Sequence, residues 1–118
     1  MLVASYDSHI GWIDVRGTGL WSQEDLDHYV ASLPSMLASM RRSIGYARVL
    51  ADLSDANVQT QSMIDQISGF TADLFNTEDR IAIIVPSTLM KMQMRRGVKT
   101  AQTEIFVSAI AAKSWLMT

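Results

Sequence analysis

Short apolar runs that alternate with longer stretches of helical periodicity limit the fold of this chain more than any other feature. Residues 49–53 and 81–85 are compact apolar runs, which suits strands buried on both faces of a parallel sheet. Between them, apolar side chains recur at helical spacing from residue 63 to residue 75. Because helices that alternate with strands connect parallel neighbours, this pattern predicts an α/β fold.

Three further strands complete the predicted sheet. Residues 10–17 alternate apolar and polar side chains, as a half-buried strand does. A turn at Asp7 and Ser8 would lead into this strand from an antiparallel partner over residues 2–6. A last, short strand is predicted over residues 104–107. The chain should therefore form a mixed, mostly parallel sheet of about five strands.

Four helices are predicted from apolar stripes and capping residues. Pro34 lies well inside the first helix and predicts a kink or a split, and Gly45 suits its end. The second helix follows the stripe from Met63 to Phe75, which includes Ile64. The third should run to about residue 100. Residues suited to begin the first, third and fourth helices are Ser22, Ser87 or Thr88, and Ser108.

The predicted topology leaves one face of the sheet to be covered. Connections between parallel strands are right-handed. If neighbouring strands follow the chain order, every crossover helix then lies on the same face. A second subunit is the simplest cover for the other face, so we expect a homodimer.

Composition excludes several classes of function. The 118 residues suit one domain spanning residues 1–118. A formal net charge of −2 argues against nucleic-acid binding, and the lack of Cys excludes disulfides and thiolate metal sites. The opening residues lack the basic start and apolar run of a signal peptide, and no stretch reaches the ~20 apolar residues of a membrane span. We expect a soluble, cytoplasmic protein without a transmembrane segment.

Four segments carry a resemblance to a known family. They are GLWSQEDLDHYV at 19–30, RVLADLSDA at 48–56, RIAIIVPSTLMKMQMRR at 80–96 and TEIFVSAIAAKSWL at 103–116. Over nearly its whole length, the chain resembles the STAS or SpoIIAA-like domains of anti-sigma-factor antagonists, whose fold is shared by CRAL-TRIO lipid-binding domains. The resemblance implies a single SpoIIAA-like domain with right-handed helical crossovers and a non-enzymatic regulatory role in a bacterial protein.

The segment that carries the phosphorylation switch in that family departs from its pattern here. The antagonists place the switch serine in an Asp-Ser-Ser-Gly-like segment at a helix N-terminus. In this chain Gln61 stands at the switch position and Met63 at the glycine position. Thr60 and Ser62 are the remaining candidate phosphorylation sites, because a phosphate is favoured at a helix N-terminus. The alternative is that both hydroxyls only cap the helix.

Polar residues follow the predicted strands at their carboxyl ends. Ligands of open α/β sheets bind at these ends, and helix N-termini point toward them. Such residues can hold a small anion or contact a partner, although caps and turns favour the same residue types. The residues predicted for this site are Thr18, Trp21, Asp52, Ser54, Asp55, Ser87 and Thr88.

The third predicted helix is basic and rich in methionine. Residues 1–79 contain 4 basic and 11 acidic residues, whereas residues 80–118 contain 6 basic and 1 acidic. This helix can bind an acidic partner surface or anionic lipid, or it can pack its methionines on the sheet and leave a solvated basic face. Its basic residues are Lys91, Arg95, Arg96 and Lys99.

The sequence offers little for catalysis, and no catalytic residue, cofactor or metal is predicted. Asp52 and Asp55 are a candidate carboxylate pair, but nothing else supports a sugar cleft or a magnesium site. His9 and His28 lie far apart in sequence, and neither has a further ligand at the spacing that zinc needs.

Two functional hypotheses follow. The leading one is a non-enzymatic regulatory or protein-interaction module. The alternative is a carrier or sensor of a small apolar, lipid-like ligand held by a soft layer of methionine and phenylalanine side chains, although such a layer is more often core. The residues of this layer are Met36, Met40, Met63, Phe70 and Phe75.

Overall fold

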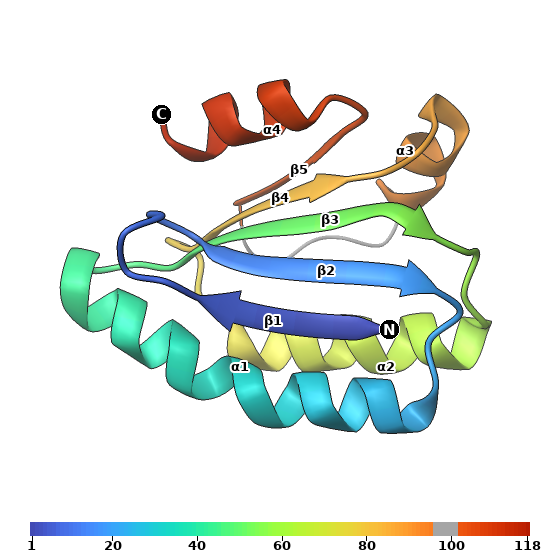
Figure 1. The fold of residues 1–118 in the computed structure, drawn as a ribbon, viewed down its shortest axis with the longest axis horizontal. Helices are drawn as coiled ribbons and strands as arrows, with labels where there is room; N and C mark the ends of the chain where they lie inside the picture. The colour runs from blue at the N-terminus through green and yellow to red at the C-terminus, as the bar shows by residue number, and fades with distance from the viewer. Residues whose placement is uncertain (96–101) are drawn as a thin grey trace.

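The computed structural model describes residues 1–95 and 102–118 and contains one five-stranded sheet (Figure 1). The strands are β1 (Leu2–Tyr6), β2 (Ile13–Gly19), β3 (Arg48–Ala56), β4 (Arg80–Ile84) and β5 (Gln102–Phe106), side by side in chain order. β1 pairs antiparallel with β2, and all the other pairs are parallel. The predicted mixed, mostly parallel sheet is confirmed.

The helices are α1 (Gln23–Ile44), α2 (Gln61–Leu74), α3 (Thr88–Met94) and α4 (Ala109–Leu116), so the predicted order of elements is confirmed. β2 begins three residues later than predicted, because Ile10 lies in a turn and its N–H donates to the carbonyl of Asp7 at 3.0 Å. The predicted extension of the third helix to about residue 100 lies outside the described residues. None of the described helices is long and apolar enough to cross a membrane.

Hydroxyl caps begin the helices as the sequence predicts. The side chain of Ser22 accepts the N–H of Asp25, whose carboxylate accepts the N–H of Ser22 in return. This reciprocal pair satisfies two donors that a helix start otherwise leaves free. α1 ends at Gly45, whose φ of 88° suits a residue without Cβ. Side chains also cap the other three helices, at Thr60, Ser87 and Ser108.

Pro34 does not split α1, which runs through it as one helix of 22 residues. Proline lacks the N–H that would bond the carbonyl four residues earlier. Pro34 lies on the exposed side of α1, where water can reach that carbonyl, while Leu33 and Leu37 beside it are fully buried. Packing of the apolar stripe against the sheet therefore outweighs the lost hydrogen bond.

The crossover helices lie on one face of the sheet. α1 and α2 lie beneath it in Figure 1, and Met90 and Met94 of α3 pack against the same core. Ile13, Val49 and Leu33 are among the fully or nearly fully buried residues of this core. Placement of these helices on one face agrees with right-handed connections between strands that follow the chain order.

The second face receives part of its cover from the chain itself, where a second subunit was expected as the simplest cover; the homodimer stays a prediction. α4 lies over β3, β4 and β5 on this face (Figure 1). Ala112 and Leu116 of α4 are fully buried there against Leu50 and Ile84. The half formed by β1 and β2 stays open, and the side chain of Val3 is 47% exposed.

The methionine and phenylalanine layer is packed core. Met40, Met63 and Phe75 are buried in the main cluster, and Met36 and Phe70 pack against it from partly buried positions. The prediction that Ile64 belongs to the buried stripe of the second helix is wrong. Ile64 is exposed, and Met63 is the residue of α2 that is buried.

A buried carboxylate that the sequence analysis missed joins three segments at the amino ends of the strands. Asp79 is 0% exposed and forms an ion pair with Arg41 of α1 at 2.5 Å. The N–H groups of Ala47 and Asn76 also donate to it, each at 2.8 Å. Arg41 reaches further and donates to the carbonyl of Leu74 at the end of α2 at 3.0 Å.

Candidate functional site

The carboxyl ends of β2 to β5 form an edge that we call the carboxyl-edge rim. It consists of the segments 20–22, 57–60, 85–87 and 107–108 and the first turn of the helix that follows each of them. The parallel strands place these segments at one end of the sheet, seen at the arrowheads of β2 and β3 in Figure 1. Each segment supplies a helix cap, so the rim is held by local hydrogen bonds.

Large apolar side chains project from the carboxyl-edge rim into solvent. Val58 is 75% exposed and Leu89 is 66% exposed. The apolar stripes of the sequence do not reveal this feature, because Val58 and Leu89 belong to none of them. An apolar residue between polar loop neighbours, such as Val58 between Asn57 and Gln59, was the available signal. The exposed apolar residues of the rim are Leu20, Val58, Ile64, Leu89, Val107 and Ile110.

Three of the predicted polar residues lie together beside this rim. The hydroxyl of Ser54 donates to the carboxylate of Asp52, and the Ser54 N–H donates to the same oxygen at 3.1 Å. Asp55 pairs with Arg16 of β2 at 3.2 Å. Partial burial alone would raise the pKa of Asp52, but the bonds from Ser54 and the charges of Arg16 and Lys113 outweigh it and lower that pKa. Asp52 therefore stays an anion.

Trp21 does not line the rim as predicted, because it is part of the core. Trp21 is only 9% exposed, and its backbone N–H donates to the side-chain oxygen of Gln59 at 2.8 Å. The ring lies so close to Gly17 that a Cβ there would meet it at 2.5 Å and would meet Leu53 at 2.8 Å. Glycine at position 17 thus leaves the space that Trp21 fills.

The remaining rim residues have structural contacts of their own. Thr18 lies in β2, opposite Asp55 of β3. Ser87 caps α3 by accepting the N–H of Met90 at 3.2 Å, and exposed Thr88 is the first residue of that helix. The structure thus brings the predicted residues to one end of the sheet. All of them lie at its surface except Trp21, which is buried beneath it.

The candidate phosphorylation sites are at the start of α2. Thr60 is the cap, and its hydroxyl oxygen accepts the N–H of Met63 at 3.2 Å. Ser62 is exposed in the first turn and accepts a bond from Gln66 at 3.4 Å. Thr60 therefore has the capping role that was the alternative, whereas Ser62 makes only a side-chain contact within α2. Phosphorylation of either residue stays a prediction.

The basic helix is described only in part. Lys91 and Arg95 belong to α3 and its cap, and Arg95 pairs with Glu104 of β5 at 3.6 Å. Arg96 and Lys99 lie outside the described residues. Met90 and Met94 pack inward, whereas Met92 is exposed.

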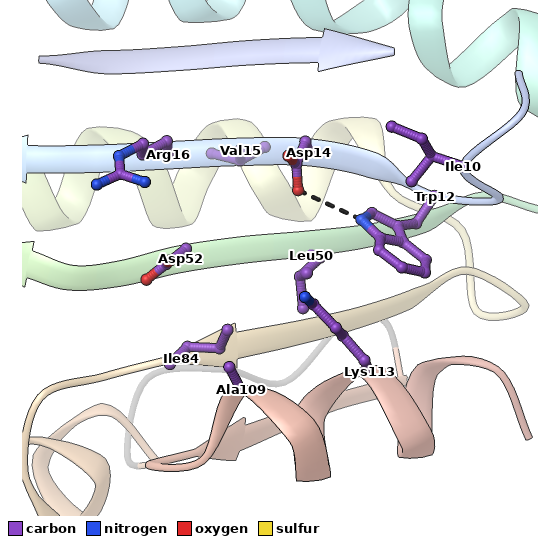
Figure 2. A pocket seen from close by; sticks show the side chains of 10 residues that line it. All are labelled: Ile10, Trp12, Asp14, Val15, Arg16, Leu50, Asp52, Ile84, Ala109 and Lys113. Carbon is purple, nitrogen blue, oxygen red and sulfur yellow. Dashed lines mark hydrogen bonds between the residues drawn. The ribbon is translucent and has the colours of Figure 1, made fainter. Parts of the chain in front are cut away.

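A groove on the second face lies between β2 and α4 and begins near the rim (Figure 2). Leu50 and Ile84 form its floor, Ala109 and Lys113 of α4 form one wall, and Trp12 lies at its far end. Its volume is about 220 Å³. The indole N–H of Trp12 donates to Asp14 at 3.3 Å. Two cations, Arg16 and Lys113, and two anions, Asp14 and Asp52, line the groove, so their charges balance.

No arrangement in the described residues suits a metal ion, since no three His, Asp or Glu side chains converge there. His9 and His28 are both exposed, and the His9 ring contacts Asp7 at 3.0 Å. Hydrogen bonds or ion pairs already hold Asp52 and Asp55. The site can offer a contact surface of apolar tips and fixed charges.

Comparison with known proteins identifies the fold. No family model matches the chain, and no curated protein matches it. A solved structure of an uncharacterised protein from Shewanella loihica PV-4, described as a DUF3478 family member with a SpoIIAA-like fold, is similar with a TM-score of 0.64. The identity is 13%, over 98% of this chain and 92% of the other. Together with the sheet order, this similarity shows that the chain has the SpoIIAA-like fold of STAS-type domains.

Proposed function

We propose that this chain is a non-enzymatic protein-interaction module of the STAS type that binds a partner protein at the carboxyl-edge rim. The observation that carries the proposal is the set of large apolar side chains exposed there, of which Ile110, Val58 and Leu89 are the most exposed. A soluble domain that exposes grouped apolar residues next to fixed charges has the composition of a recognition surface.

The surroundings of the apolar tips support recognition of a protein. The Arg16–Asp55 pair and the Asp52–Ser54 contact lie on the two strands next to the rim, so polar groups are already oriented before a partner arrives. Preorganised polar groups reduce the entropy cost of binding. The polar residues then give orientation, and desolvation of the tips gives affinity.

The packing of the core gives the apolar-ligand alternative little support. A carrier needs space between its apolar side chains, but Met40, Met63 and Phe75 are buried in contact with the main core. Phe70 packs its ring edge on Tyr29, with 5.8 Å between the ring centres. The groove of Figure 2 is lined by four charged side chains, which suits an acyl chain poorly.

Affinity capture with matched variants tests the proposal. The immobilised 118-residue chain is incubated with an extract of cells that naturally produce it. Val58→Ser with Leu89→Ser removes two exposed tips from the rim. Ile44→Ser with Met117→Ser removes two exposed apolar residues from the opposite end and is the control.

The outcomes separate the proposal from general stickiness. We expect a protein that the wild type and the control retain at similar levels and that the rim variant loses at least tenfold, which corresponds to about 1.4 kcal/mol. Equal capture by the rim variant and the wild type would show that the rim is not the binding surface. Equal loss in both variants would also contradict the proposal.

A further inference from the structure

β1 is an open edge of the sheet. The strand order places nothing beyond it in the described part of the chain (Figure 1). The N–H of Thr18 donates to the carbonyl of Met1 at 2.8 Å, and the terminal ammonium of Met1 donates back to the carbonyl of Thr18 at 2.6 Å. Since bonded pairs alternate along an antiparallel ladder, Val3 and Ser5 also face β2 with their backbone groups. The backbone groups of Leu2, Ala4 and Tyr6 therefore point outward.

This edge lacks the features that normally protect a free strand. Natural edges carry charges, proline or bulges that block a further strand. The sequence of β1, LVASY, has no charge and no proline, and its pairing with β2 is regular over all five residues. The opposite edge strand, β5, carries Glu104, which is paired with Arg95. The two edges of the sheet thus differ in their readiness to accept a strand.

We propose that β1 pairs antiparallel with β1 of a second copy of this chain across a two-fold axis at Ala4. In this register Leu2 lies opposite Tyr6 of the copy, and Ala4 lies opposite its own equivalent. Every outward N–H and C=O of the three residues then gains a partner, so the edge is self-complementary, as a two-fold interface requires. Only small, uncharged alanine lies on the axis, where a larger or charged residue would meet itself.

The surroundings of the edge fit the same occupant. A groove of about 310 Å³ lies between β1 and α1 and gives space beside the strand, with Tyr29 and Ser32 in its lining. α1 runs in the same direction as β1 (Figure 1), so the two-fold sets it antiparallel to its copy. The acidic first turn with Glu24 and Asp25 then lies on the same side as the last turn of the helix in the copy, where Arg42 is exposed. Opposite charges and opposed helix dipoles both favour this orientation.

Pairing at β1 would also extend the open half of the second face. The uncovered surfaces of β1 and β2 in the two copies would join into one surface bounded by the two α4 helices. Val3, 47% exposed in one copy, would lie next to Ser5 of the other. A second copy therefore covers the edge and leaves the carboxyl-edge rim of each copy free, so this inference does not depend on the proposed function.

The first test is the mass of the full chain in solution. Sedimentation velocity from micromolar to millimolar concentration should show a species of twice 13.1 kDa. Ala4→Pro removes an outward N–H and leaves the bonds to β2, which proline tolerates on an edge strand. We expect the dimer dissociation constant to rise about 100-fold, because the symmetric interface loses a bond from each copy. Ser5→Ala, which keeps every backbone donor, is the matched control and should remain dimeric.

The second test fixes the register and remains informative if Ala4→Pro does not fold. The chain has no cysteine, so Val3→Cys and Ser5→Cys each introduce a single thiol. Positions 3 and 5 of opposite copies lie directly across from one another, at a Cα separation of about 4.5 Å that a disulfide can span. Mixed and oxidised, the two variants should form a disulfide between unlike chains, far more than either variant forms alone. A monomer at all concentrations, or a dimer without this preferred disulfide, overturns the proposal.

Discussion

The two ends of the sheet are built differently. At the amino end, long-range polar contacts join several elements. Asp79 binds Arg41, Ala47 and Asn76. The guanidinium carbon of Arg80 lies 4.3 Å from the ring centre of Trp115, and Arg80 also donates to the carbonyl of Thr118 at 2.9 Å. At the carboxyl end, local caps begin the helices, the longer-range contacts such as Arg16–Asp55 and Trp21–Gln59 involve no fully buried charge, and apolar tips stay exposed. The buried ionic network is thus at one end, and the exposed apolar tips are at the other. Substitutions at the two ends should therefore have different consequences.

The largest loss of stability is expected for Asp79→Ala at the amino end. The change leaves the guanidinium of Arg41 and two backbone N–H groups without their acceptor in a buried place. Breaking a buried ion pair by removing one partner costs about 3–5 kcal/mol. Urea unfolding followed by circular dichroism measures this loss. Asp73→Ala, at an exposed residue, is the control, and a loss at Asp79 no greater than the control's would refute the role of this network.

The next largest effect is expected for Gly17→Ala, which probes the buried part of the carboxyl end. The added methyl group would lie 2.5 Å from the ring of Trp21, and overpacking of this kind costs about 1–3 kcal/mol. Gly69→Ala is the matched control, because nothing lies within 4 Å of a Cβ there and the change favours helix α2. Thermal unfolding should thus move in opposite directions for the two variants. If Gly17→Ala is neutral, Trp21 is not tightly packed and the rim is more adaptable than the structure indicates.

Acid should weaken the amino end through Asp79. Burial alone would raise the pKa of this carboxyl, but the bonds from Arg41 and from the N–H groups of Asn76 and Ala47 outweigh it and hold the pKa below 3.8. Because the folded pKa is the lower one, the stabilisation is fully present above the unfolded pKa and is lost as pH falls through the folded value. Urea unfolding of the wild type from pH 6 downward should show this loss. The free energy of unfolding of Asp79→Asn should fall less steeply with decreasing pH than that of the wild type. An unchanged slope would contradict the assignment of this pH dependence to Asp79.

The sequence predicts the elements well because their signals are local. The caps at Ser22 and Ser108 and the stop at Gly45 depend on residues within one turn, and apolar runs reveal the strands. The Asp79–Arg41 pair joins residues 38 positions apart, and no local pattern reports that the end of α1 meets the start of β4. Trp21 was misplaced for a similar reason, since its burial depends on the space above Gly17.

The location of the candidate site could be predicted from the sequence, but the exposed apolar side chains on it could not. The carboxyl ends of parallel strands had to meet, so Thr18 and Asp55 were expected at the same end of the sheet, and they lie opposite one another on β2 and β3. The exposure of the apolar tips depends on how each helix turns after its cap. Periodicity does not report this, as Ile64 shows: its place in the stripe predicted burial, but it faces solvent. The face covered by α4 was undetermined for the same reason.

The smallest effect on stability is expected at the rim, for Val58→Ser. Val58 is 75% exposed, so its side chain gains little from burial, and surface substitutions of this kind stay within about 0.5 kcal/mol. The same change should reduce partner capture, because the contact that Val58 makes in the complex is lost. A variant that keeps its unfolding midpoint and loses its partner separates recognition from stability and confirms the contrast between the two ends. If Val58→Ser instead lowers stability as much as Gly17→Ala does, the rim contributes to the fold, and the division between the two ends fails.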